Sequence, residues 1–145
     1  MIQQFQPRYP EVLIKLRAFV IVNILATGFH LYHNVRYIDS VYFESLSLRY
    51  PLILGWFLLT LFGLFSFKYF KAGRITFALH ALLLYSVLSL ASLIHYYYFS
   101  ITRFTLTANA GILSEALVAF LFSLYILNVI FVRNFNHTRN KLFVG

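Results

Sequence analysis

Four long apolar stretches constrain the fold of this chain more than any other feature. They cover roughly residues 18–35, 51–67, 75–99 and 106–132. A helix that crosses a bilayer needs about 20 mostly apolar residues, with a range of about 17–25. Backbone groups in hydrocarbon must be paired within the protein, and the chain lacks the alternating strands of about ten residues that build a membrane barrel. The sequence therefore predicts an all-α, polytopic integral membrane protein, a four-transmembrane-helix bundle.

The composition agrees with a membrane protein and narrows the chemistry. Only 11% of the residues are charged, whereas soluble domains carry about 25%. There is no cysteine, which excludes disulfides, thiolate metal sites and thiol nucleophiles. The net charge of +8 comes from basic residues at the edges of the apolar stretches, and this placement is typical of membrane topology. The expected partner is the lipid bilayer, and no nucleic acid is expected.

The basic residues also predict an orientation. Four spans place both termini and the 68–74 connection on one side of the membrane. Three of the 12 Lys and Arg residues, Arg36, Arg49 and Arg103, lie on the opposite side, which leaves nine on the terminal side. Positive residues accumulate in the cytoplasm. We therefore expect the cytoplasmic membrane of a bacterium, with both termini cytoplasmic.

Residues 1–145 are expected to form a single four-helix membrane domain, because no linker, repeat or low-complexity segment divides the chain. The segment "KYFKAGR" predicts a tight turn between the second and third spans, with Gly73 suited to a helix C-terminus.

Four ionisable side chains fall in the outer half of the predicted bundle. With a rise of about 1.5 Å per residue, His30 and Glu115 lie about 5 Å outward of the bilayer centre. His33 lies about 10 Å and His95 about 12 Å outward on the same scale. Ionisable residues inside membrane spans are costly and commonly functional. Three of the four helices therefore contribute to one candidate site.

Helical periodicity places polar or small residues beside these groups. A stripe on the first helix holds Asn23, Thr27, His30 and Asn34. The third helix has a stripe of Tyr85, Ser89, Ser92 and Tyr96 with His95 at its margin, and the fourth has Gly111, Glu115 and Ala119 on one face. Asn23, Thr27, Asn34 and Ser92 are predicted to hold the ionisable side chains in place. The second helix offers only Thr60, Ser66, Gly55 and Gly63 and is expected to be mainly structural.

Imidazole and carboxylate together suit a transition metal ion such as Zn, Fe, Cu or Mn. The predicted metal ligands are His30, His33, His95 and Glu115. Simpler interpretations remain for three of them: His33 and His95 would face the membrane interface, and Glu115 would be a neutral acid bonded to a neighbouring helix. A haem between His95 and either His30 or His33 ranks lower, because Glu115 is an unfavourable neighbour.

The leading hypothesis is a small membrane protein that binds a transition metal or a small polar ligand at this His/Glu site. Redox chemistry, catalysis and sensing all remain open, so the sequence does not decide whether the protein is an enzyme. A second hypothesis is a non-catalytic accessory or assembly subunit of a larger membrane complex. A membrane-protein partner and a homo-oligomer both stay open as assemblies; a stoichiometric partner favours this hypothesis, and a homo-oligomer counts against it. A third is a binding protein or enzyme for a hydrophobic molecule such as a sterol, quinone or carotenoid.

Overall fold

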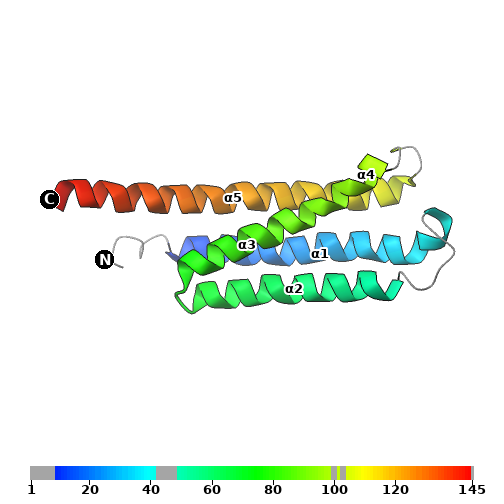
Figure 1. Ribbon diagram of the computed structural model, residues 1–145, viewed down its shortest axis with the longest axis horizontal. Coiled ribbons are helices and arrows are strands. Elements are labelled where there is room, and N and C mark those ends of the chain that lie inside the picture. Colours follow the sequence, from blue (N-terminus) through cyan, green and yellow to red (C-terminus); the bar gives the residue numbers. More distant parts are fainter. Residues whose placement is uncertain (1–8, 42–48, 99–100, 102–103, 145) are drawn as a thin grey trace.

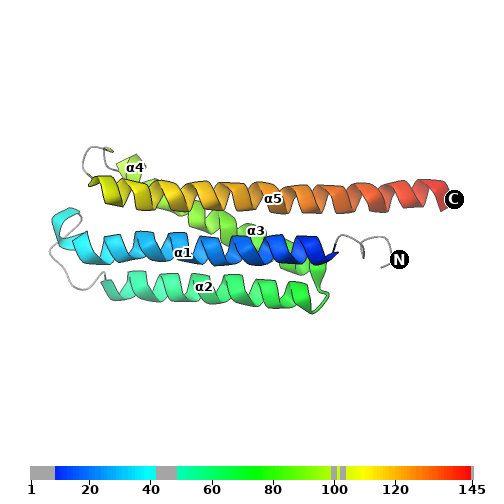
Figure 2. The same cartoon turned by 180° about the vertical axis from the view of Figure 1, so that it is seen from behind.

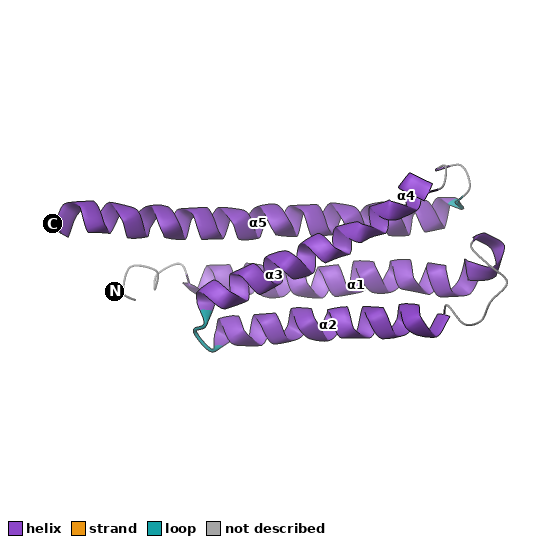
Figure 3. Cartoon of the chain, viewed as in Figure 1, coloured by secondary structure: helices purple, strands orange, loops and turns teal. Residues whose placement is uncertain are grey.

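The described part of the chain is helical throughout. The computed structural model describes residues 9–41, 49–98, 101 and 104–144, and within these ranges there is no strand. The helices in chain order are α1 (Tyr9–Val41), α2 (Arg49–Lys71), α3 (Ile75–Ser89), the 3₁₀ segment η3 (Leu90–Leu93), α4 (Ile94–Tyr98) and α5 (Leu106–Val144) (Figures 1 and 3). The all-α prediction is confirmed.

Four helical segments are long and apolar enough to cross a membrane. They are Tyr9–Arg36, Tyr50–Lys71, Ile75–Tyr97 and Leu106–Arg133. Each of the four predicted apolar stretches lies largely within one of them, so the chain is an integral membrane protein with a four-helix bundle. The helices are longer than the apolar stretches because regular helix continues into the polar residues that flank each span.

Helix α1 begins and helix α5 ends at the same end of the bundle (Figures 1 and 2). We call this the terminal end, and it also holds the turn between α2 and α3. The distal end holds the last turns of α1, the first turns of α2, and α4 (Figure 1). Helix α5 runs from the distal end and continues past the other helices at the terminal end (Figure 1). This arrangement follows from an even number of spans.

The α2–α3 turn is built as the sequence predicts. Gly73 has a φ of 81°, a conformation that glycine adopts without steric cost. The Gly73 N–H donates to the Phe70 carbonyl at 3.0 Å, and the Arg74 N–H donates to the Tyr69 carbonyl at 3.1 Å. These bonds pair the last carbonyls of α2, which would otherwise be unsatisfied.

The third span is interrupted where the sequence predicts one continuous helix. Segment η3 winds as a 3₁₀ helix over Leu90–Leu93 before helical structure resumes at Ile94. A 3₁₀ helix has about 3.0 residues per turn instead of 3.6, so these four residues rotate the following helix by roughly 80°. The interruption therefore changes the direction in which His95 points.

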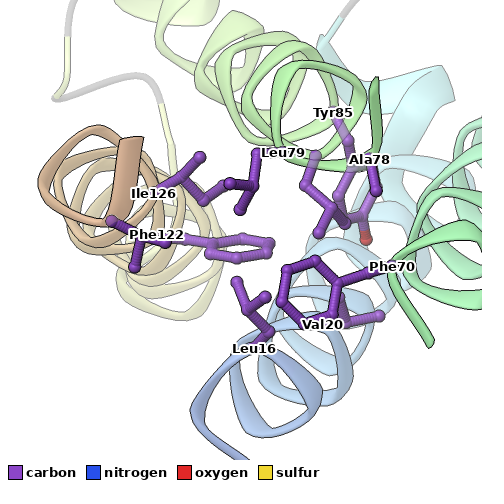
Figure 4. Packing of buried hydrophobic residues seen from close by; sticks show 10 residues of the cluster. Leu16, Val20, Phe70, Ala78, Leu79, Tyr85, Phe122 and Ile126 are labelled. Carbon is purple, nitrogen blue, oxygen red and sulfur yellow. The ribbon is translucent and has the colours of Figure 1, made fainter. Parts of the chain in front are cut away.

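The largest buried apolar side chains gather in the terminal half of the bundle. Figure 4 shows this core, where all four long helices contribute to the cluster of Leu16, Val20, Phe70, Ala78, Leu79, Leu82, Tyr85, Phe122, Ile126 and Val129. The rings of Phe19 and Phe122 stack with centroids 5.1 Å apart. Several buried polar side chains, among them His30 and Glu115, lie nearer the distal end. The interior is thus divided into an apolar and a polar half.

The orientation can be tested with single cysteines, because the natural chain has none. We expect a membrane-impermeant maleimide to label Thr105→Cys in intact cells, since Thr105 is exposed just before α5 and the distal end faces outward if the positive residues are cytoplasmic. Ala72→Cys, at the terminal end, should react only after the membrane is permeabilised. Labelling of Ala72→Cys alone in intact cells would show the opposite orientation.

Two glycines in α2 give a matched test of the packing. A Cβ atom at Gly63 would lie 2.8 Å from ring atoms of Tyr85, whereas a Cβ at Gly55 would meet nothing within 4 Å. Gly63→Ala should lower the stability by about 1–3 kcal/mol, because the buried ring must shift. Gly55→Ala should be neutral or slightly stabilising. Thermal unfolding in detergent measures both, and equal midpoints would contradict the packing.

Candidate functional site

A buried pair of ionisable side chains joins α1 to α5. The Nδ1 atom of His30 and the Oε2 atom of Glu115 form a hydrogen bond, and each side chain is only 8% exposed. One turn before Glu115, a Cβ at Gly111 would lie 3.4 Å from the Cα of His30. The absence of a side chain at Gly111 therefore lets the two helices approach closely enough for the pair to form.

The amide of Asn34 connects this pair to His95. Asn34 Nδ2 lies 3.0 Å from Nε2 of His30 and 3.5 Å from Nε2 of His95. The Nδ1 atom of His95 lies 2.8 Å from the carbonyl oxygen of Ser92. A carbonyl oxygen only accepts, so His95 Nδ1 carries a proton, and its Nε2 carries a lone pair that can accept a hydrogen bond when the ring is neutral. The two hydrogens of the Asn34 amide nitrogen can thus be donated to both rings.

These bonds select one tautomer of His30. With Nε2 accepting from Asn34, the proton of a neutral His30 ring is on Nδ1 and is donated to Glu115. The carboxyl group therefore orients the imidazole and leaves Nε2 as its basic atom. Carboxylate–imidazole dyads with this geometry activate nucleophiles in hydrolases and support histidine ligands of metals. The arrangement is suited to accepting a proton or a metal at Nε2.

A small cavity lies beside the dyad and opens to the surface of the bundle. Its volume is about 130 Å³, and its lining residues from α1, α2 and α5 are Thr27, His30, Leu31, Asn34, Trp56, Leu59 and Glu115. Trp56 Nε1 donates to Thr27 Oγ1 at 3.0 Å, and Thr27 Oγ1 donates to the Ile24 carbonyl at 3.1 Å. At about 30 Å³ per water, the cavity has room for about four waters or a small polar group.

The structure brings together three of the four predicted ligands. Glu115, His30 and His95 belong to one hydrogen-bonded chain, with Asn34 between the two histidines. His33 is buried, and its ring packs edge-on against Phe29 and Tyr32 with centroids 4.8 and 5.6 Å apart. Among the described residues, no three His, Asp or Glu side chains are grouped so that they could hold a metal ion.

The four predicted supporting residues have different roles. Asn34 contacts both histidines directly, and Thr27 lines the cavity. Ser92 contributes its backbone carbonyl to His95. Asn23 is fully buried and donates from Nδ2 to Ser89 Oγ at 2.9 Å, a contact that joins α1 to α3 outside the cavity lining.

Sequence reasoning missed Trp56. The prediction that the second helix is mainly structural is incomplete, because Trp56 of α2 lines the cavity and donates to Thr27. Trp56 is the single tryptophan of the chain. An indole N–H inside a membrane span needs a hydrogen-bond acceptor, and Thr27 is a hydroxyl residue at a similar depth. The need for this acceptor was the signal in the sequence from which the role of Trp56 could have been predicted.

No family model, no curated protein and no solved structure matches this chain.

The dyad makes a prediction about stability. His30→Leu removes the partner of Glu115, and a buried polar group without a partner costs about 1–3 kcal/mol. The matched control is His80→Leu, because His80 lies in another span and is exposed. We expect His30→Leu to lower the midpoint of thermal unfolding in detergent and His80→Leu to leave it nearly unchanged. Equal midpoints for the two variants would contradict a stabilising dyad.

Proposed function

We propose that this membrane protein binds a small uncharged ligand, or the polar head of a larger one, in the cavity beside the Glu115–His30 dyad. One observation supports this proposal above the others: the dyad is buried among helices and yet lines a cavity that opens to the surface. A purely structural polar pair has no need of such an opening.

The lining residues define the kind of ligand. They provide a carboxyl group, an imidazole, an amide and a hydroxyl, from Glu115, His30, Asn34 and Thr27, and among the described lining residues none is Lys or Arg. Phosphate or carboxylate groups would therefore lack a cationic partner. A hydroxyl can donate to Glu115 or His30 and accept from Asn34, whereas a carbonyl can accept from Asn34.

The dyad also provides acid–base chemistry. A ligand hydroxyl that replaces the Asn34 amide at Nε2 of His30 can transfer its proton to that atom. The Glu115 carboxylate would then stabilise the imidazolium, as in other carboxylate–histidine pairs. Reversible proton transfer between a bound hydroxyl and Nε2 of His30 is thus the reaction class that we propose.

A metal site is the second candidate, and a separate observation favours it. The Nε2 atoms of His30 and His95 converge on one amide, and each Nδ1 atom is held by an oxygen, from Glu115 or Ser92. Metal-bound histidines commonly have such supporting bonds. In this second candidate the two imidazoles bind Zn, Cu, Fe or Mn. Glu115 does not bind the metal but holds the His30 ring through its hydrogen bond to Nδ1. Haem is not proposed, because ring centroids 4.9 Å apart leave no room for a macrocycle between His30 and His95.

Two variants distinguish the candidates. In native-lipid particles, mass spectrometry should find an organic ligand in the wild type and in His95→Ala, since His95 does not line the cavity. The ligand should be lost from Glu115→Gln, whose amide changes the hydrogen bonding of the dyad. Elemental analysis and an absorption spectrum of the same samples report on metals and pigments.

The opposite pattern would favour the metal. A stoichiometric metal ion in the wild type that is lost from His30→Ala and His95→Ala would contradict the organic ligand. A folded wild-type sample that holds neither an organic ligand nor a metal would contradict both candidates.

A further inference from the structure

A second hollow lies along the first two turns of α2. Its volume is about 590 Å³, and its described lining residues are Tyr50, Pro51, Ile53, Leu54, Trp56 and Phe57. Residues 50–57 extend about 11 Å along the helix axis. Ile53, Leu54 and Phe57 are 44%, 58% and 51% exposed. They belong to a membrane span, so this hollow faces the hydrocarbon of the bilayer.

Trp56 belongs to both the apolar hollow and the polar cavity. Its indole N–H is held by Thr27 at 3.0 Å. Its ring packs on Gly28, where a Cβ would lie 3.4 Å from Cζ2. Two neighbouring residues of α1 thus fix the indole between a polar compartment and an apolar one.

The sizes of the two spaces indicate what would fill them. The polar cavity of about 130 Å³ accommodates a head group but not a whole lipid. The hollow along α2 is larger and faces hydrocarbon, so it suits an apolar ring system or chain. Among the described residues that line either space there is no Lys or Arg, so an anionic head group would be left without a partner.

We infer that the ligand is a lipid-soluble molecule with an uncharged, hydroxyl- or carbonyl-bearing ring, which enters from the bilayer between α1 and α2. The ring reaches the Glu115–His30 dyad, and the apolar body lies against Trp56 and the first turns of α2. This inference rests on the proposed function and adds the class of ligand and its route.

The single tryptophan makes the site directly observable. Protein in lipid nanodiscs would be titrated with two quenchers of Trp56 fluorescence, a decyl-substituted benzoquinone and a brominated sterol alcohol, which separate the two sources of such a ring. We expect saturable quenching by at least one of them. A benzoquinone without a chain, compared at equal membrane-bound concentration, should need about tenfold more probe for half-saturation, which corresponds to about 1.4 kcal/mol.

A matched pair of glycine variants tests the junction. Gly28→Leu introduces a side chain against Trp56, whereas Gly55→Leu adds the same side chain at a position where a Cβ meets nothing within 4 Å. Gly28→Leu should raise the half-saturating concentration of the quencher that binds the wild type about tenfold, again about 1.4 kcal/mol, and Gly55→Leu should leave it unchanged. Circular dichroism and thermal unfolding check the fold of both variants. If either variant fails to fold, the comparison of the two benzoquinones on the wild-type protein still tests the inference.

Three results would overturn the inference. Equal half-saturation by the benzoquinones with and without the chain would show that the hollow is not used, while saturable binding itself would still support the proposed function. Tighter binding of a decyl probe with a carboxylate head would exclude an uncharged head. Absence of saturable quenching by both lipid-soluble probes would overturn the lipid ligand, and the proposed function would then depend on the Glu115→Gln mass spectrometry alone.

Discussion

The hydrogen bond between Glu115 and His30 is the interaction on which the polar half of the bundle depends. A charged side chain near the centre of a membrane helix costs about 2.5–3.5 kcal/mol on insertion scales. Glu115 is 8% exposed, so its partner must come from another helix. That requirement fixes how α1 and α5 align, and Gly111 allows the necessary approach. Asn34 and His95 then complete the hydrogen bonding of the imidazole.

The division of the interior determines how a ligand can reach the dyad. In the terminal half, apolar side chains from all four long helices fill the space between them (Figure 4). Polar groups in the distal half are joined by hydrogen bonds between α1, α3 and α5, including Asn23 with Ser89 and Glu115 with His30. Most residues that line the cavity belong to α1 and α2. Access through the apolar half would require this packed core to separate, so the proposed route lies in the distal half, between α1 and α2 beside Trp56.

Much of the fold could be predicted because it depends on local signals. Apolar stretches define the four spans, and the depth estimate placed Glu115 and His30 at one level because the helical rise is constant. The orientation of His95 could not be predicted, since η3 rotates the end of the third span. The role of Trp56 depends on a hydrogen bond between two helices, which periodicity within one helix does not reveal. The packing of His33 against Phe29 and Tyr32 is likewise decided by side-chain direction more than by depth.

The energetics of the dyad explain why the apolar hollow matters for binding. In the structure described, Glu115, His30 and Asn34 are already hydrogen-bonded to one another. A ligand head that contacts His30 must replace the Asn34 amide, so it exchanges one hydrogen bond for another. A hydrogen bond contributes a net of about 0.5–1.5 kcal/mol. Replacing the bond from Asn34 by an equivalent bond from the ligand therefore adds less than this to the binding free energy. The polar cavity would therefore provide orientation and acid–base chemistry, while most of the affinity would come from packing of an apolar body against Trp56 and α2.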